Sequence, residues 1–123
     1  MSHCCATKNV MFLACSGGSN VGQIANDAAK QLDSLGQGRM FCAVGVAALG
    51  GGFTKAASDA SCVVAIDGCE VACVRKAMER EGLNPHVHVV ATDLGIEKAH
   101  RFDYTQEEVA KVGEAVTKAV ATL

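Results

Sequence analysis

Two cysteines follow an apolar run of the chain at a spacing that suits metal or redox chemistry. The run Val63–Ile66 stops at Asp67, and the helical pattern that begins there carries Cys69 and Cys73. Residues four apart share one face of an α-helix, so both sulfur atoms can point to one place. A helix N-terminus has unpaired N–H groups and partial positive charge, which favour a thiolate over a thiol. The pair is therefore half of a metal site or of a redox centre.

Two further cysteines complete this candidate site. Cys15 follows the apolar run Val10–Ala14 and precedes a glycine turn, and Cys42 lies inside the shorter apolar run Met40–Val44. Short apolar runs bounded by turn residues predict buried strands. In parallel sheets, ligands lie beyond the carboxyl ends of the strands, at the point where the strand order reverses. Three separate segments are therefore expected to bring four cysteines to one end of the sheet.

Four thiolates around one ion form the usual closed zinc site, with sulfur about 2.3 Å from the metal. The predicted cofactor is Zn²⁺, and the predicted metal ligands are Cys15, Cys42, Cys69 and Cys73. The chain has no C-x-x-C pair of the kind found in zinc ribbons and thioredoxins, so the prediction depends on topology. One alternative is an enzyme or redox carrier that uses the thiol of Cys15 or Cys69. Another is an iron–sulfur protein, because four thiolates also suit iron.

Other catalytic motifs are excluded by single missing residues. A phosphatase loop needs an arginine six residues after Cys15 to hold a phosphate dianion, and Val21 stands there instead. The glycine-rich stretch Gly45–Gly52 lacks the Lys-Ser/Thr ending of a P-loop, and Gly50–Gly52 is not followed at the right distance by the acidic residue of a dinucleotide site. We interpret that stretch as a flexible or closely packed loop.

Nearby titratable residues have a structural interpretation. Asp67 and Glu70 are predicted to cap the helix that carries the cysteine pair, with a hydrogen bond from Asp67 to a metal ligand as the alternative. Cys62 begins a strand, at the opposite end of the sheet, and is predicted to be a buried core residue. His86 and His88 alternate along one strand and are predicted to have partners within the protein rather than to bind metal.

Composition limits the classes of function. The chain has 123 residues, which indicates one domain, and a net charge of −2 with no basic stripe for nucleic acid. No run approaches the roughly 18 apolar residues of a membrane span. Residues 1–8 lack the features of a secretory signal and are predicted to be a flexible tail carrying His3, Cys4 and Cys5. Seven cysteines in such a chain are more typical of ligands or reactive thiols than of disulfides, which predicts a cytoplasmic protein.

Strands that alternate with helices predict right-handed crossovers and a parallel sheet. We therefore expect residues 9–123 to form a single-domain, three-layer α/β sandwich with a four-stranded, mostly parallel sheet. The expected strand order is the flavodoxin- or Rossmann-like 2-1-3-4. The predicted strands are Val10–Ala14, Met40–Val44, Cys62–Ile66 and His86–Ala91. Helices are predicted after Ser19 or Asn20, near Phe53, after Asp67 and after Thr105, where Glu108 completes a capping box.

Around Asp67-Gly68-Cys69 the chain resembles the DGC-domain family, which is named after this tripeptide. The segments Cys15–Gln23 and Met40–Val46 are similar to two other cysteine segments of the family, in the same order. The resemblance covers most of the chain and implies a zinc-binding protein whose biological role is not established. Carried over residue by residue, it implies the chelating cysteines Cys15, Cys42, Cys69 and Cys73.

The expected function is that of a small cytoplasmic zinc-binding protein. The metal would serve structure, metal handling or recognition of a protein partner, and the sequence does not identify that partner. Backbone rather than side chains surrounds the predicted metal at Gly17, Gly18, Gly45 and Gly50–Gly52. Free N–H groups at a helix N-terminus bind small anions, so a small anion beside the zinc ion is a second predicted ligand.

Overall fold

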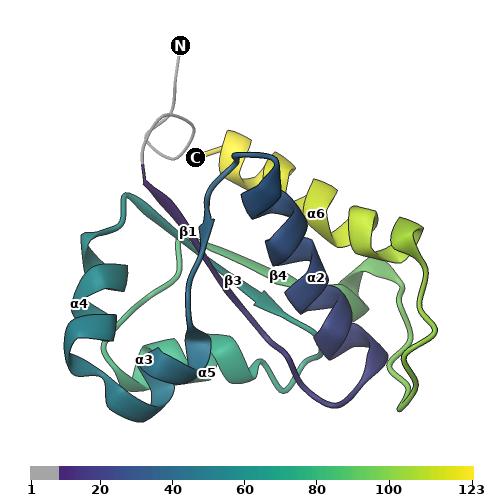
Figure 1. Cartoon of the computed structure of the whole chain (residues 1–123), viewed down its shortest axis with the longest axis horizontal. Helices are drawn as coiled ribbons and strands as arrows, with labels where there is room; N and C mark the ends of the chain where they lie inside the picture. The colour runs from purple at the N-terminus through teal and green to yellow at the C-terminus, as the bar shows by residue number, and fades with distance from the viewer. Residues whose placement is uncertain (1–8) are drawn as a thin grey trace.

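Four parallel strands form a central sheet in the order β2-β1-β3-β4 (Figure 1). The structure is a computed structural model that describes residues 9–123. The strands are β1 (Val10–Ala14), β2 (Arg39–Met40), β3 (Cys62–Asp67) and β4 (Val87–Val90). β1 pairs with β2 and β3, and β3 pairs with β4, in each case in parallel. The predicted strand order is confirmed, and the sheet is parallel throughout.

Helices α2 (Asn20–Ser34) and α6 (Gln106–Ala121) cover one face of the sheet. They lie side by side in Figure 1, where α3, α4 and α5 lie on the other side of the sheet. Every second residue of the central strands points to this face, including Phe12, Val64 and Ile66. One face of α6 lies in the same core, because its Val109, Val112 and Val116 are fully buried.

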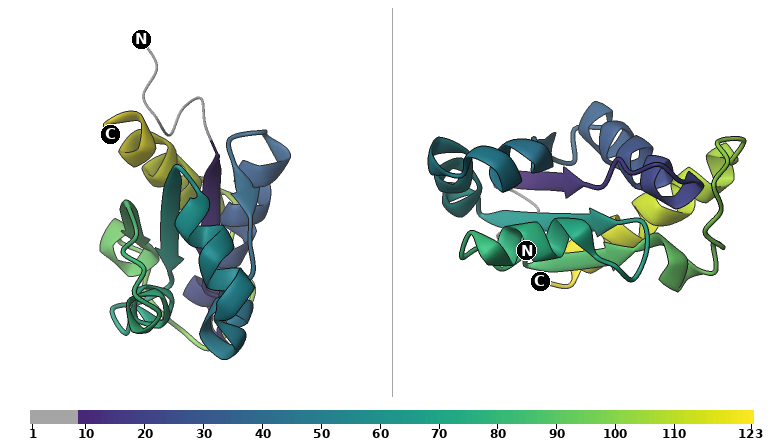
Figure 2. Two further views of the ribbon diagram at one scale, coloured as in Figure 1. Left: turned by 90° about the vertical axis from the view of Figure 1, so that its left-hand side faces the viewer. Right: turned by 90° about the horizontal axis from the view of Figure 1, so that it is seen from below.

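The opposite face is covered by α3 (Ala43–Leu49), α4 (Gly51–Asp59) and α5 (Cys73–Arg80). These helices lie together in Figures 1 and 2. The intervening strand residues Met11, Leu13, Val63 and Ala65 pack against them and form a second core. The period of two along β1 and β3 thus places apolar side chains on both faces, as a buried parallel strand requires. The structure has the three layers that the sequence predicts.

The N-termini of the two long helices have the capping residues that the sequence predicts. Ser19 caps α2 and accepts a hydrogen bond from the Gly22 backbone N–H at 3.1 Å. Thr105 and Glu108 form the predicted capping box at the start of α6. After β4 the chain makes a short 3₁₀ helix, η1 (Ala91–Leu94), before the irregular connection to α6.

The prediction for residues 40–52 is wrong in detail. β2 ends at Met40, so Cys42 lies beyond the strand, and helix α3 replaces most of the predicted loop. The glycine at position 45 permits this helix to approach its neighbour, since a Cβ atom there would lie 2.5 Å from the Phe53 ring. Val46, one residue on, is buried in the second core. Tertiary packing therefore makes a helix out of a stretch whose glycines predict a loop.

The predicted flexible tail, residues 1–8, lies outside the described residues, and so do His3, Cys4 and Cys5. Within residues 9–123, none of the helices combines the length and the apolar character needed to cross a membrane.

Candidate metal centre

Three of the four predicted metal ligands line one hollow beyond the carboxyl end of β1. The hollow has a volume of about 400 Å³, and Cys15, Cys42 and Cys73 contribute to its wall. Most of the other residues that line it are apolar, among them Met40, Phe41, Val44 and Ala47. The three thiols come from the β1–α2 loop, the link between β2 and α3, and the first turn of α5. We refer to this feature as the thiol hollow.

Hydrogen bonds to backbone N–H groups fix the directions of two sulfur atoms. The Cys15 sulfur, partly buried at the end of β1, accepts a bond from the Gly17 N–H at 3.3 Å. Cys42 is the N-cap of α3, and its sulfur accepts a hydrogen bond from the Gly45 N–H at 3.2 Å. Both cysteines thus sit at loop or helix starts, which is where parallel α/β sheets place ligand-binding residues.

Cys69 is separate from the thiol hollow. It packs against the core on the α2 and α6 face of the sheet, whereas Cys42 and Cys73 lie on the side of α3 and α5. Its sulfur accepts a hydrogen bond from the Lys98 ammonium group at 3.4 Å. Cys15 packs against both cores and so lies between the two groups of thiols.

The predicted helical arrangement of Cys69 and Cys73 is wrong. α5 begins at Cys73, and Cys69 lies in a turn that the Ala72 N–H closes by donating to the Cys69 carbonyl at 3.0 Å. Ala72 has a left-handed conformation, with φ of 55°, which interrupts a continuous helix. The two sulfur atoms therefore do not share one helix face.

The four thiols suit zinc in donor type, because thiolates are the usual ligands of a closed zinc site. In the part of the chain from residue 9 onwards, no three Cys, His, Asp or Glu side chains lie close enough together to hold a metal ion. Cys15, Cys42 and Cys73 would have to turn further into the hollow, and Cys69 would have to leave Lys98. These movements concern loops and helix starts, so they are compatible with an unchanged sheet.

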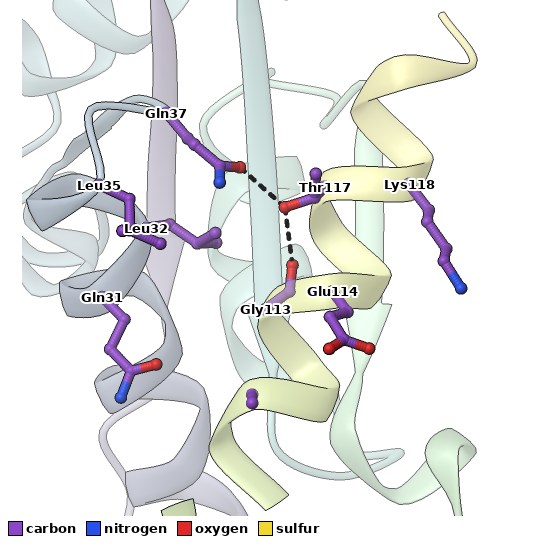
Figure 3. A pocket seen from close by; sticks show the side chains of 9 residues that line it. Gln31, Leu32, Leu35, Gln37, Gly113, Glu114, Thr117 and Lys118 are labelled. Atoms are coloured by element: carbon purple, nitrogen blue, oxygen red, sulfur yellow. Dashed lines mark hydrogen bonds between the residues drawn. The ribbon is translucent and has the colours of Figure 1, made fainter. Parts of the chain in front are cut away.

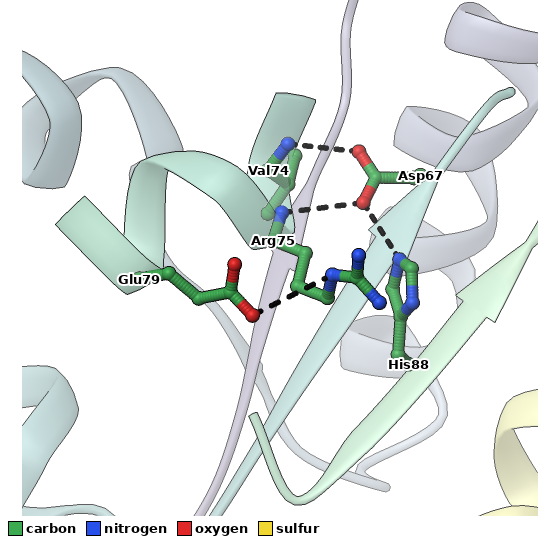
Figure 4. A network of polar contacts seen from close by, with 5 residues as sticks. All are labelled: Asp67, Val74, Arg75, Glu79 and His88. Carbon is green, nitrogen blue, oxygen red and sulfur yellow. Dashed lines mark hydrogen bonds and ion pairs between the residues drawn. The ribbon is translucent and has the colours of Figure 1, made fainter. Parts of the chain in front are cut away.

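Asp67 caps α5, although not in the way that the sequence predicts (Figure 4). Its carboxylate, 1% exposed, accepts hydrogen bonds from the backbone N–H groups of Val74 at 2.8 Å and Arg75 at 3.2 Å. A third bond, of 2.8 Å, joins it to the Nε2 atom of His88 on β4. The predicted pairing with Glu70 is wrong, because the turn at residues 68–72 separates Asp67 from the helix that it caps.

The predicted protein partners of the two histidines and the predicted burial of Cys62 are confirmed. His86 Nδ1 accepts a hydrogen bond from the Val63 backbone N–H at 3.0 Å, and His88 is bound to Asp67. Both histidines therefore have protein partners. Cys62 is fully buried at the start of β3, far along the strand from the thiol hollow.

Comparisons with known proteins identify the family of the chain. The profile of the DGC domain matches residues 11–116, which span all four strands. The chain belongs to the DGC-domain family. The Anaerobic and virulence modulator AnvM of Pseudomonas aeruginosa is 31% identical over 102 residues, which are 83% of this chain and 78% of that protein. The comparison with solved structures gives no match.

Residues 95–104, a polar segment of the DGC domain, contact the glycine turn after Cys15 and the start of α2. The Asn20 side chain donates to the Glu97 carbonyl at 2.8 Å and accepts from the Ala99 N–H at 2.7 Å. His100 Nδ1 lies 2.9 Å from the Gly18 carbonyl. Two N–H groups of the predicted anion site have protein partners, since Gly22 donates to Ser19 and Asn20 donates to Ala99. The anion stays a prediction.

The same segment carries Lys98, whose contact with Cys69 sequence reasoning missed. These contacts join residues 29 to 82 positions apart, and residues 95–104 have no hydrophobic period that would locate them. The only local signal is the accumulation of polar residues after Gly95.

A second hollow of the DGC domain, about 410 Å³, lies between α2 and α6 (Figure 3). Leu32 and Leu35 of the α2 side and Gly113 and Thr117 of α6 contribute to its wall. The Thr117 hydroxyl donates to the Gln37 side-chain oxygen at 2.7 Å across one end. Neither cysteine nor histidine lines this hollow, so it is distinct from the candidate metal centre.

Proposed function

We propose that this DGC-domain protein is a small cytoplasmic zinc-binding protein whose metal ligands are Cys15, Cys42, Cys69 and Cys73. The observation that carries the proposal is the thiol hollow, where cysteines from three separate segments are among the lining residues. Buried structural cysteines are normally dispersed in a core, as Cys62 is. Thiols gathered at the carboxyl end of a parallel sheet instead favour a binding role.

Bound zinc would link separate segments of the chain to one another. Its ligands would connect the β1–α2 loop, the start of α3 and the start of α5, which the sheet alone leaves apart. Cys69 completes four sulfur donors only if its sulfur leaves the Lys98 ammonium group. Four sulfur ligands fill the tetrahedral shell of zinc, so we propose a closed site without a position for substrate.

A closed site favours structure, metal handling or partner recognition over catalysis. The relative AnvM is named a modulator, and that name supports partner recognition as the role to examine first. The compartment is part of the proposal, because reduced thiols persist in the cytoplasm and an odd number of cysteines suits ligation better than disulfides.

The test is metal analysis of protein purified without air. We expect about one zinc ion per chain, the stoichiometry of a single four-thiolate site. Separate serine variants of the four ligands should each lose stoichiometric zinc. The matched controls are Cys62→Ala and Cys4→Ser, which remove a thiol that we do not assign to the site. Equal loss of zinc in ligand and control variants would contradict the assignment.

The same samples decide between the proposal and its alternatives. A colourless protein with zinc excludes an iron–sulfur cluster, because zinc is d¹⁰ and iron–sulfur clusters absorb visible light. A disulfide between two of the four cysteines, together with absence of zinc, would favour a redox carrier. That alternative is supported by the presence of Cys15, Cys42 and Cys73 in the lining of one hollow.

A further inference from the structure

One buried carboxylate connects three elements next to the thiol hollow. Asp67 ends β3, and its oxygen atoms reach the first turn of α5 and the ring of His88 on β4 (Figure 4). A carboxylate that is 1% exposed is expensive to bury unless hydrogen bonds satisfy it. The two backbone N–H groups of α5 provide part of that stabilisation, and His88 Nε2 provides the third bond.

These bonds hold the part of α5 that carries a proposed zinc ligand. Cys73 is the first residue of α5, and Val74 and Arg75, whose N–H groups bind Asp67, are the next two. The turn before Cys73 contains the left-handed Ala72, so the turn does not continue the helix. The position of Cys73 at the thiol hollow therefore depends on the carboxylate rather than on an unbroken helix.

His88 supports this carboxylate from the neighbouring strand. A ring nitrogen that donates to a carboxylate fixes the direction of that carboxylate, in the same way that a carboxylate orients a histidine in metal sites. The Arg75 side chain extends from the same turn of α5 (Figure 4). Its Nε atom is buried without a hydrogen-bond partner and lies 3.7 Å from a Glu79 carboxylate oxygen. The Arg75 Nε atom therefore does not substitute for His88 at Asp67.

We infer that Asp67 and His88 are positioning residues, which set the place of Cys73 in the thiol hollow by holding the first turn of α5. The inference rests on the proposed function only in its consequence for zinc affinity. The other part of the inference, that Asp67 and His88 hold Val74 and Arg75 in place, applies to the metal-free protein.

The chain offers a matched control two residues away. His86 also forms a hydrogen bond to β3 through a ring nitrogen, but its Nδ1 atom accepts from the Val63 N–H near the start of that strand. His86→Ala therefore removes one imidazole and one hydrogen bond to the same strand without touching α5. His88→Gln is the conservative variant, because a glutamine amide can still donate to Asp67.

The first measurement is amide hydrogen exchange of the metal-free protein, residue by residue, by NMR. We expect His88→Ala to speed exchange of the Val74 and Arg75 amides relative to wild type, and His86→Ala to leave them unchanged. The second measurement is zinc affinity. We expect His88→Ala to weaken it about 10- to 100-fold, the usual effect of losing an outer partner of a metal ligand, with recovery in His88→Gln.

The outcomes separate the two proposals. Unchanged exchange at Val74 and Arg75 in His88→Ala would overturn the inference, whatever the protein does with zinc. Equal loss of zinc affinity in His88→Ala and His86→Ala would also overturn it, because both would then act only through general stability. Absence of zinc binding by the wild-type protein would contradict the proposed function, while the exchange measurement would still decide whether Asp67 and His88 hold α5.

Discussion

The sulfur atom of Cys42 accepts a hydrogen bond from the Gly45 backbone N–H at 3.2 Å and so caps helix α3. Serine, threonine, aspartate and asparagine are the usual residues at this position. Cys42 therefore has one role in local structure and a second, proposed role as a metal ligand. The two roles require different properties of the side chain, so substitutions can separate them.

We expect Cys42→Ser to keep α3 and Cys42→Ala to destabilise it. A serine hydroxyl can accept the Gly45 bond, whereas alanine leaves that N–H without a cap. Loss of a capping side chain typically costs about 0.5 to 2 kcal/mol in the free energy of unfolding. Urea denaturation of the metal-free variants measures the difference, and equal free energies of unfolding would contradict the capping role. Both variants are expected to lose stoichiometric zinc.

The position of Cys42 also illustrates where sequence reasoning failed. Met40–Val44 is an apolar run that predicts a strand, yet β2 contains only Arg39 and Met40. A cysteine is not a recognised cap, so the start of α3 had no sequence signal. In the same way, nothing in the sequence indicates that Ala72 would adopt a left-handed conformation and separate Cys69 from α5.

The predictable part of the fold depends on strong periodic patterns. β1, β3 and the two long helices have continuous or regularly spaced apolar residues, and α6 also has a capping box, so these elements agree with the prediction. The parallel sheet follows from the alternation of strands and helices, and the order 2-1-3-4 is the common doubly wound one. Single contacts over long sequence separations were not predictable. The bonds from Lys98 to Cys69 and from Asn20 to Glu97 depend on tertiary packing and leave no local pattern.

Gly68, the central residue of Asp-Gly-Cys, lies against the backbone of α2. A Cβ atom at this position would lie 2.8 Å from the Gly22 nitrogen and 2.9 Å from the Val21 oxygen. The neighbouring atoms are backbone and cannot turn aside as a flexible side chain would. The glycine therefore permits the turn that carries Cys69 to approach the first turn of α2.

We expect Gly68→Ala to destabilise the protein by about 1 to 3 kcal/mol, the usual penalty for inserting atoms into a well-packed place. Gly18→Ala is the matched control, because a Cβ atom at Gly18 meets nothing within 4 Å. The free energy of unfolding in urea measures both effects. A Gly68→Ala protein as stable as the Gly18→Ala protein would show that the approach to α2 is unimportant for stability.

Removal of zinc is expected to leave the sheet and its helices intact. The two apolar cores contain the buried residues of β1 and β3 and do not include Cys42 or Cys73. A domain of this size buries enough apolar surface to fold without metal, unlike a zinc finger. Far-ultraviolet circular dichroism before and after chelation measures the helix content. A large loss of helix signal would mean that the metal is part of the folding energy.

Tyr104 is expected to titrate at unusually high pH. Its hydroxyl donates a hydrogen bond to the Asp27 carboxylate of α2, and this bond, together with burial and the negative charge of Asp27, raises the pKa of Tyr104 to about 12. The pKa of the folded state thus exceeds the ordinary value of about 10 for an unfolded chain. The contact therefore contributes stability that is fully present below pH 10 and is lost as the pH rises towards about 12.

The measurement is direct, because Tyr104 is the single tyrosine of the chain and tyrosinate absorbs in the ultraviolet. We expect the absorbance of the native protein to titrate with a midpoint near 12, provided that the protein is folded at each point. Asp27→Asn removes the charged acceptor and should move the midpoint towards the ordinary value. Asp33→Asn is the control, since Asp33 lies on the same helix and accepts instead from the Met40 N–H at 2.7 Å. Identical midpoints in the Asp27→Asn and wild-type proteins would contradict the hydrogen bond between Tyr104 and Asp27.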